Sequence, residues 1–110
     1  MSQSNLSKRR HIMDYIYGMP RLVRQEVKNF AKVMEYKLAR NDFKNQWRDR
    51  GAEDSKWFLD RLKDEVQELE EALEEGSALD VILETADVAN FAMMIADVFS
   101  REHELNLGGE

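Results

Sequence analysis

The chain has 110 residues, no cysteine and a formal net charge of -6 at pH 7. This length allows one domain, and the lack of cysteine excludes disulfide bonds and thiolate metal sites. No segment approaches the ~20 apolar residues that span a membrane, and the first residues lack the apolar run of a secretory signal. Together with the lack of cysteine, these features lead us to expect a cytoplasmic protein. The overall acidity argues against binding of nucleic-acid polymers through bulk charge.

The composition predicts an all-α fold, because the chain contains one Pro and five Gly and no alternating strand pattern. We expect an N-terminal arm or short helix over residues 1–19, an all-α domain over 20–104 and a flexible tail over 105–110. Pro20 suits the first turn of a long helix, where its missing N–H costs nothing. The apolar stripe of this first helix ends near Asn41 and consists of Val23, Val27, Phe30, Met34 and Leu38.

Two further long helices follow a polar segment that contains Gly51. The second is expected to begin at Asp54 or Ser55 and to end at Gly76, in a left-handed cap. The third is expected to run from Ala78 to about Ser100, after a capping box formed by Ser77 and Asp80. The expected core stripe of the second helix is Leu59, Leu62, Val66, Leu69 and Leu73.

Charge is distributed unevenly along the chain. Residues 1–63 contain fifteen of the sixteen Lys and Arg, whereas residues 64–100 contain eleven carboxylates and no Lys, Arg or His. A run of acid without an internal counter-charge must be neutralised by water or by cations. The outward-facing acids of the second helix are expected to be solvated; they are Asp64, Glu70, Glu71, Glu74 and Glu75.

Two carboxylate pairs differ from the rest of this run. At about 100° per residue, Glu65 and Glu68 border the apolar seam of the second helix. Glu84 and Asp87 lie in a third helix that is apolar on every side, which indicates burial against other helices. An ionised carboxylate without a partner is costly to bury, and four carboxylates without His or Cys suit a hard cation such as Mg²⁺ or Mn²⁺.

The two motifs and their surroundings resemble a known family. Glu65-x-x-Glu68 within KWFLDRLKDEVQELEEAL, followed by Glu84-x-x-Asp87 and VANFAMMIAD, is similar to the MazG-type all-α nucleoside triphosphate pyrophosphohydrolases over residues 55–99. The resemblance implies Mg²⁺ bound by these four carboxylates and hydrolysis of (deoxy)nucleoside triphosphates to monophosphate and pyrophosphate, in a nucleotide-pool house-cleaning role. It also implies that Glu65 or Glu68 orients or deprotonates the attacking water.

The substrate-binding residues are expected on the same two helices. The resemblance places Asn90, one turn beyond Asp87, against the nucleotide. Many members of the family carry a basic stretch after the second motif, but here only Arg101 follows it. The phosphate-binding cations are therefore expected elsewhere, with Arg61 first and Lys56 next, while Trp57 is expected either to stack on a base or to anchor packing.

A MazG-type helical bundle needs more helices than this chain supplies. We therefore expect a homodimer or homotetramer, in which subunits complete each other's core. Two other functions remain open at this point. One is a phosphoribosyl-ATP pyrophosphatase-like enzyme, which resembles this family in fold and metal motif. The other is a non-catalytic helical adaptor.

Overall fold

The computed structural model describes residues 8, 10–12, 14–16, 18, 22–40 and 47–103. Its elements are α2 (Gln25–Arg40), the short 3₁₀ helices η2 (Trp47–Asp49) and η3 (Ala52–Asp54), α3 (Ser55–Glu75) and α4 (Ala78–Glu102). All elements of this part of the chain are helical, so the predicted all-α class is confirmed. The residues described before Gly18 are also helical, and all of them are exposed. Pro20 and the expected tail over 105–110 lie outside the described residues.

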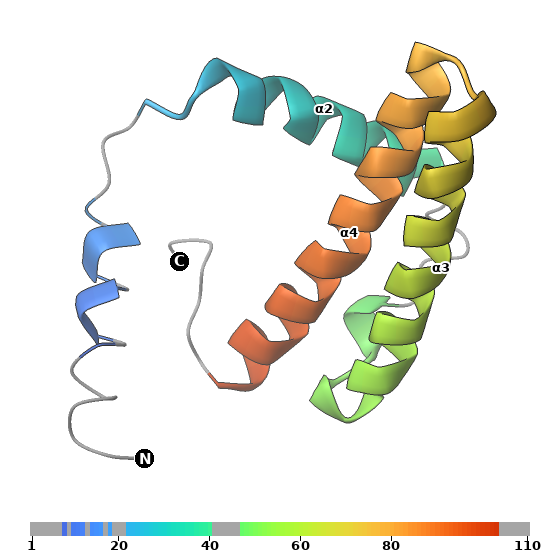
Figure 1. Cartoon of the computed structure of the whole chain (residues 1–110). Helices are drawn as coiled ribbons and strands as arrows, with labels where there is room; N and C mark the ends of the chain where they lie inside the picture. Colours follow the sequence, from blue (N-terminus) through green and yellow to red (C-terminus); the bar gives the residue numbers. More distant parts are fainter. Residues whose placement is uncertain are drawn as a thin grey trace.

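The centre of the fold is an antiparallel hairpin of α3 and α4, which α2 crosses on the α4 side (Figure 1). The connection between α3 and α4 is short because both helix ends are fixed locally. Ser77 Oγ accepts a hydrogen bond from the backbone N–H of Asp80, and Asp80 Oδ2 accepts one from the backbone N–H of Ser77, each at 3.2 Å. The predicted capping box is therefore present, and α4 begins at the predicted residue.

Gly76 ends α3 as predicted, but the expectation of a left-handed cap is wrong. Its φ of −87° and ψ of 167° are extended, and its N–H donates to Ala72 O at 2.7 Å. Glycine is needed here because of a close approach rather than a positive φ. A Cβ at this position would lie 2.8 Å from the carbonyl oxygen of Ala72, which is backbone and cannot move aside cheaply.

The capping box gives a first testable prediction. Ser77→Ala removes the side-chain acceptor of the Asp80 N–H and is expected to lower the free energy of unfolding by about 1 kcal/mol. In a domain of this size, that loss corresponds to a fall of roughly 4–8 °C in the thermal midpoint. Ser77→Asp, which keeps an acceptor, serves as the control and should stay near the wild-type midpoint. Equal midpoints for wild type and Ser77→Ala would show that the box does not stabilise the start of α4.

The buried core lies at the end of the hairpin opposite to the α3–α4 turn. It consists of Trp47, Phe58, Met94 and Val98, with Phe91 among the half-buried residues packed around it. Trp47 enters this core from η2, so it is a packing anchor. The 3₁₀ segment is held against α4 by the N–H of Ala52, which donates to Glu102 Oε1 at 2.8 Å, and by Arg101, which donates to Arg48 O at 3.2 Å.

The buried face of α3 is rotated from the predicted one. Its buried residues are Phe58, Glu65 and Ala72, whereas Leu73, predicted for the core, is 65% exposed. Leu59 and Val66 are exposed as well, and only Leu62 and Leu69 of the predicted stripe are half-buried. The reason is that α4 packs on the side of Phe58 and Ala72, so the predicted stripe becomes the edge of the interface. This rotation moves Glu65 from the border of the seam to its centre.

Two further expectations about helices need correction. α2 begins at Gln25 rather than at Pro20, so Val23 precedes it, and no residue of α2 is buried. α4 is not enclosed on all sides within one chain. Ala86, Asn90, Met94 and Val98 form its buried side, whereas Ile82, one turn before Ala86, and Phe99 are exposed. Among the described residues, no helix is long and apolar enough to cross a membrane.

Candidate metal centre

Three of the four predicted carboxylates come together between α3 and α4. One oxygen each from Glu65, Glu84 and Asp87 lies within 4.8 Å of the others. Glu65 reaches this point because the rotated packing of α3 turns it toward α4. Glu84 and Asp87, three residues apart on α4, are neighbours on one side of that helix. We call these three residues the carboxylate cluster.

Glu68 lies beside the cluster but outside it. It is one turn beyond Glu65 on α3 and is exposed, so it stands on the solvent side. Burial is the main cause of the raised pKa of Glu65, and the neighbouring carboxyl group of Glu68 raises it further. Glu68 also acts on Glu84 and Asp87 through its charge. The two predicted pairs therefore meet, with one member of the first pair buried and the other open to solvent.

Burial and mutual repulsion make the cluster hold protons more firmly than isolated carboxyls do. Glu65 is 9% exposed, and burial, followed by the neighbouring Glu68, Asp87 and Glu84, raises its pKa to about 8. The pKa of Glu84 is raised by burial and then by Asp87 and Glu68. The pKa of Asp87 is raised by burial too, although the charge of Lys37 opposes that shift. Near neutral pH the metal-free cluster therefore keeps a proton on Glu65, because its surroundings do not stabilise a negative charge on all three carboxyl groups.

Two oxygens of the cluster are left without partners. Glu65 Oε2 and Glu84 Oε2 are buried and accept no hydrogen bond from the residues that the structure describes. Such atoms are costly unless something else satisfies them. A hard divalent cation fits this donor set, because every candidate ligand is a carboxylate oxygen and neither His nor Cys is present in the cluster.

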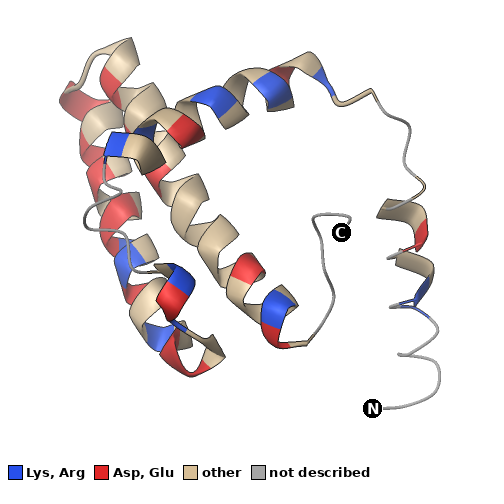
Figure 2. Ribbon diagram, turned by 180° about the vertical axis from the view of Figure 1, so that it is seen from behind, with Lys and Arg blue, Asp and Glu red and all other residues tan. Residues whose placement is uncertain are grey.

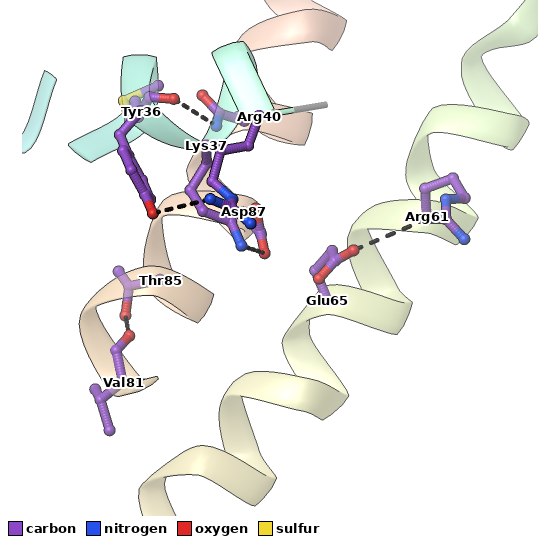
Figure 3. Close-up of polar contacts among 10 residues, drawn as sticks. Tyr36, Lys37, Arg40, Arg61, Glu65, Val81, Thr85 and Asp87 are labelled. Carbon is purple, nitrogen blue, oxygen red and sulfur yellow. Dashed lines mark hydrogen bonds and ion pairs between the residues drawn. The ribbon is translucent and has the colours of Figure 1, made fainter. Parts of the chain in front are cut away.

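Two cationic side chains contact the cluster (Figure 3). Lys37 Nζ on α2 lies 3.3 Å from Asp87 Oδ2, and Arg61 on α3 lies 3.9 Å from Glu65 Oε1. Arg61 divides its guanidinium between Glu65 and Asp64, at 3.7 Å, and lies over the ring of Phe91, 5.6 Å from its centroid. The prediction that Arg61 is near the carboxylates agrees with this geometry.

Lys37 was missed by the sequence reasoning. The only signal was its position between Met34 and Leu38, which places it on the side of α2 that faces the hairpin. A lysine on such a side can bury its stem and still reach a carboxylate with its ammonium group. Which carboxylate it reaches depends on where α2 crosses α4, and the sequence does not show that.

The structure does not bring Lys56 to the cluster. At 100° per residue, Lys56 points to the side of α3 opposite to Glu65. Its side chain is 86% exposed and pairs with Asp60 at 3.1 Å. Lys56 is part of a solvated ion pair away from the cluster, so the expectation that it binds substrate has no support from the geometry of the site.

Asn90 is also placed differently from the prediction. It is 3% exposed, and its Nδ2 donates to the backbone carbonyl of Met34 at 3.1 Å. This burial leaves no open surface for the predicted nucleotide contact. Asn90 instead connects α4 to α2, one turn before Lys37.

Trp57 lies at the other side of the site and is partly exposed. The guanidinium of Arg50 stacks 3.6 Å from the centroid of its ring. Its edge contacts with Phe58 and Phe91 place it in the aromatic packing around the core. One face of the indole is therefore already covered by a cation, which favours the packing role over the stacking role.

An acidic pocket of about 350 Å³ opens beside the cluster, toward the α3–α4 turn. Its walls come from both helices, and the lining residues are Glu68, Glu71, Ala72, Glu75, Gly76, Asp80 and Glu84. In Figure 2 the turn end of the hairpin carries Asp and Glu, whereas acidic and basic residues occur together on α2 and at the opposite end of the hairpin. Among the described residues that line this pocket none is cationic, so an anionic ligand that reaches the cluster from this side needs cations to accompany it.

Comparison of the chain with protein-family models, curated proteins and solved structures gives no significant match.

Proposed function

We propose that the protein is a Mg²⁺-dependent nucleoside triphosphate pyrophosphohydrolase of the MazG-like type. The observation that carries this proposal is the carboxylate cluster, in which two antiparallel helices bring together three carboxyl groups with unpartnered buried oxygens. The spacing of the two motifs supports it as well, because both pairs lie within one hairpin as the resemblance implies.

The residues divide into separate roles in this proposal. Glu65, Glu84 and Asp87 hold the divalent cation, and Glu68 completes the set from the solvent side. A bound Mg²⁺ (or Mn²⁺) would supply charge neutralisation of phosphate oxygens and would lower the pKa of the attacking water. Glu68 is exposed and next to Glu65, so we assign to it the task of orienting that water and accepting its proton. Arg61, at the edge of the cluster, binds a phosphate oxygen of the substrate.

The products of the proposed reaction are a nucleoside monophosphate and pyrophosphate. A triphosphate carries up to four negative charges, and the pocket beside the cluster is lined only by acids and small residues. This combination explains why the proposal requires a cation that accompanies the substrate. A phosphoribosyl-ATP substrate carries the same triphosphate, so that activity is the second candidate.

A homodimer or homotetramer is part of the proposal. Leu59, Val66 and Leu73 form an exposed apolar row along α3, and Ile82 and Phe99 are exposed on α4. These apolar side chains are exposed in one chain, and a second copy of the chain would bury them. A non-catalytic adaptor would also bury them, but it would not need unpartnered carboxylates in its interior.

The test is a nucleotide panel assay with purified full-length protein and Mg²⁺. Pyrophosphate and monophosphate are quantified separately, for ribo- and deoxyribonucleoside triphosphates and for phosphoribosyl-ATP. We expect equimolar pyrophosphate and monophosphate from at least one nucleotide, and no product when EDTA is present. Release of orthophosphate together with a nucleoside diphosphate would contradict the proposed reaction. No product from any nucleotide, at several Mg²⁺ and Mn²⁺ concentrations, would favour the adaptor.

A further inference from the structure

Lys37 is fixed over the cluster by contacts on both sides of it along α2. One turn before it, the carbonyl of Met34 accepts the hydrogen bond from Asn90, and directly after it Leu38 packs against the core. The Lys37 and Asp87 side chains are 20% and 18% exposed, so the pair is largely shielded from solvent. The ammonium group is therefore held at one place rather than sampling the surface.

The position of Lys37 differs from that of Arg61 in one respect. Arg61 lies on the same helix as Glu65 and divides its charge between Glu65 and Asp64, with its side chain about half exposed. Lys37 comes from a different helix and reaches Asp87, a member of the cluster, at the shorter distance of 3.3 Å. Figure 3 shows the two cations approaching the cluster from different helices.

Asp87 has two possible uses for its charge. It belongs to the set of three carboxylates that can hold a cation, and its Oδ2 also forms an ion pair with Lys37. A divalent cation on Asp87 would weaken the attraction between this carboxylate and the ammonium group, since the two cations repel each other. The flexible four-carbon stem of Lys37 lets the ammonium group move by a few ångströms to another anion while its backbone stays in place.

We propose that Lys37 is a substrate-binding residue that contacts a phosphate oxygen of the metal-bound substrate. This inference rests on the proposed function, which assigned Arg61 on α3 to the phosphate, and adds a second phosphate-binding cation from α2. Without metal and substrate, Lys37 stabilises Asp87. With a cation held by the cluster, the ammonium group of Lys37 would be released from Asp87 and could bind a phosphate oxygen of the substrate. Lys37 thus weakens the binding of metal in the absence of substrate, and it strengthens the binding of phosphate to the metal-loaded protein.

These two opposite effects define the experiment. Calorimetry measures the binding of Mn²⁺ alone to the full-length protein, and then the binding of inorganic pyrophosphate to the Mn²⁺-loaded protein. For Lys37→Met we expect Mn²⁺ to bind several-fold more tightly, because a competing positive charge is gone. We expect pyrophosphate to bind roughly tenfold or more weakly, as for loss of a hydrogen bond to a charged group. Lys37→Arg should retain most of the pyrophosphate affinity.

The control is Lys32→Met, an exposed lysine on the same helix, which should match the wild type in both titrations. A merely structural role of Lys37 would weaken both ligands together and lower the thermal midpoint. That result would overturn the inference, as would unchanged pyrophosphate binding by Lys37→Met. If Lys37→Met does not fold, Lys37→Gln takes its place. Failure of wild-type protein to bind Mn²⁺ would instead contradict the metal site, and thereby the proposed function itself.

Discussion

Glu84→Gln is expected to abolish hydrolysis while leaving the metal-free protein as stable as the wild type or more stable. Glu84 lies in the cluster, and its Oε2 is buried without a partner. Replacing the carboxyl by an amide of the same shape removes a charged ligand of the cation and at the same time removes a carboxylate that its neighbours repel. We expect turnover to fall by at least about 100-fold, more than the loss of a group that only supports a metal ligand. Pyrophosphate release under saturating Mg²⁺ measures the loss, and thermal unfolding in EDTA measures stability.

Glu71→Gln is the matched control for this variant. Glu71 lies on α3, lines the pocket beside the cluster and is exposed. It should retain most of the wild-type turnover. Full activity of Glu84→Gln would refute the assignment of the metal ligands. Equal losses in both variants would show that the pocket needs its total charge rather than the particular geometry of the cluster.

The second large effect is a dependence of stability on both pH and metal. In the folded, metal-free protein the pKa of Glu65 is raised from 4.5 to about 8. Between these two values the folded state keeps a proton that the unfolded chain has released. The free energy of unfolding therefore falls as the pH rises from about 4.5 to about 8, and the contribution of Glu65 is fully lost above that range. The raised pKa values of Glu84 and Asp87 act in the same direction.

Mg²⁺ should reverse this trend, because it binds the deprotonated carboxylates and only the folded chain presents them together. At 100 times its dissociation constant a single cation stabilises the fold by about 2.7 kcal/mol, which corresponds to a rise of roughly 11–22 °C in the thermal midpoint of a domain of this size. We expect this increase to be larger at pH 8 than at pH 6. Thermal unfolding across pH 5–9, with EDTA or with saturating Mg²⁺, measures it.

Glu65→Gln tests whether Glu65 is responsible both for the pH dependence and for the stabilisation by Mg²⁺ in that experiment. Its metal-free stability should change less with pH than that of the wild type, and Mg²⁺ should raise its midpoint little. A wild-type midpoint that ignores saturating Mg²⁺ at pH 8 would count against a preformed site. A metal-free midpoint that rises between pH 5 and pH 8 would contradict the description of the cluster as a group of destabilised carboxylates.

The local features of the fold could be predicted from the sequence, because they depend on residues that are close together along the chain. The capping box of Ser77 and Asp80 needs only three residues and a helix start, and both bonds are present. Glu84 and Asp87 lie on one side of α4 because helix geometry alone sets the direction of residues three apart. The meeting of these two with Glu65 needs two antiparallel helices joined by two residues, which the sequence predicts, and the rotated packing of α3, which it does not.

The features that depend on how helices pack could not be predicted in the same way. α3 has apolar residues over a wide arc, so its own sequence does not determine which of them are buried. The packing of α4 buries Phe58 and Ala72 and leaves Leu59 and Leu73 exposed. The reach of Lys37 to Asp87 depends on the crossing of α2, which is 50 residues distant in sequence from Asp87. The family resemblance implies that Asn90 faces the nucleotide. In the structure the packing of α2 on α4 turns its amide toward the carbonyl of Met34.

The central claim is that Glu65, Glu84 and Asp87 form a divalent-metal centre, and one measurement tests it directly. Crystals of the protein grown with Mn²⁺ should show a peak in the anomalous difference map between α3 and α4. We predict that it lies within about 2.0–2.3 Å of a carboxylate oxygen from each of these three residues, the range of a hard cation bound to oxygen. An anomalous map with no peak at this position, or with peaks only on exposed acids such as Glu71 and Glu75, would contradict the claim.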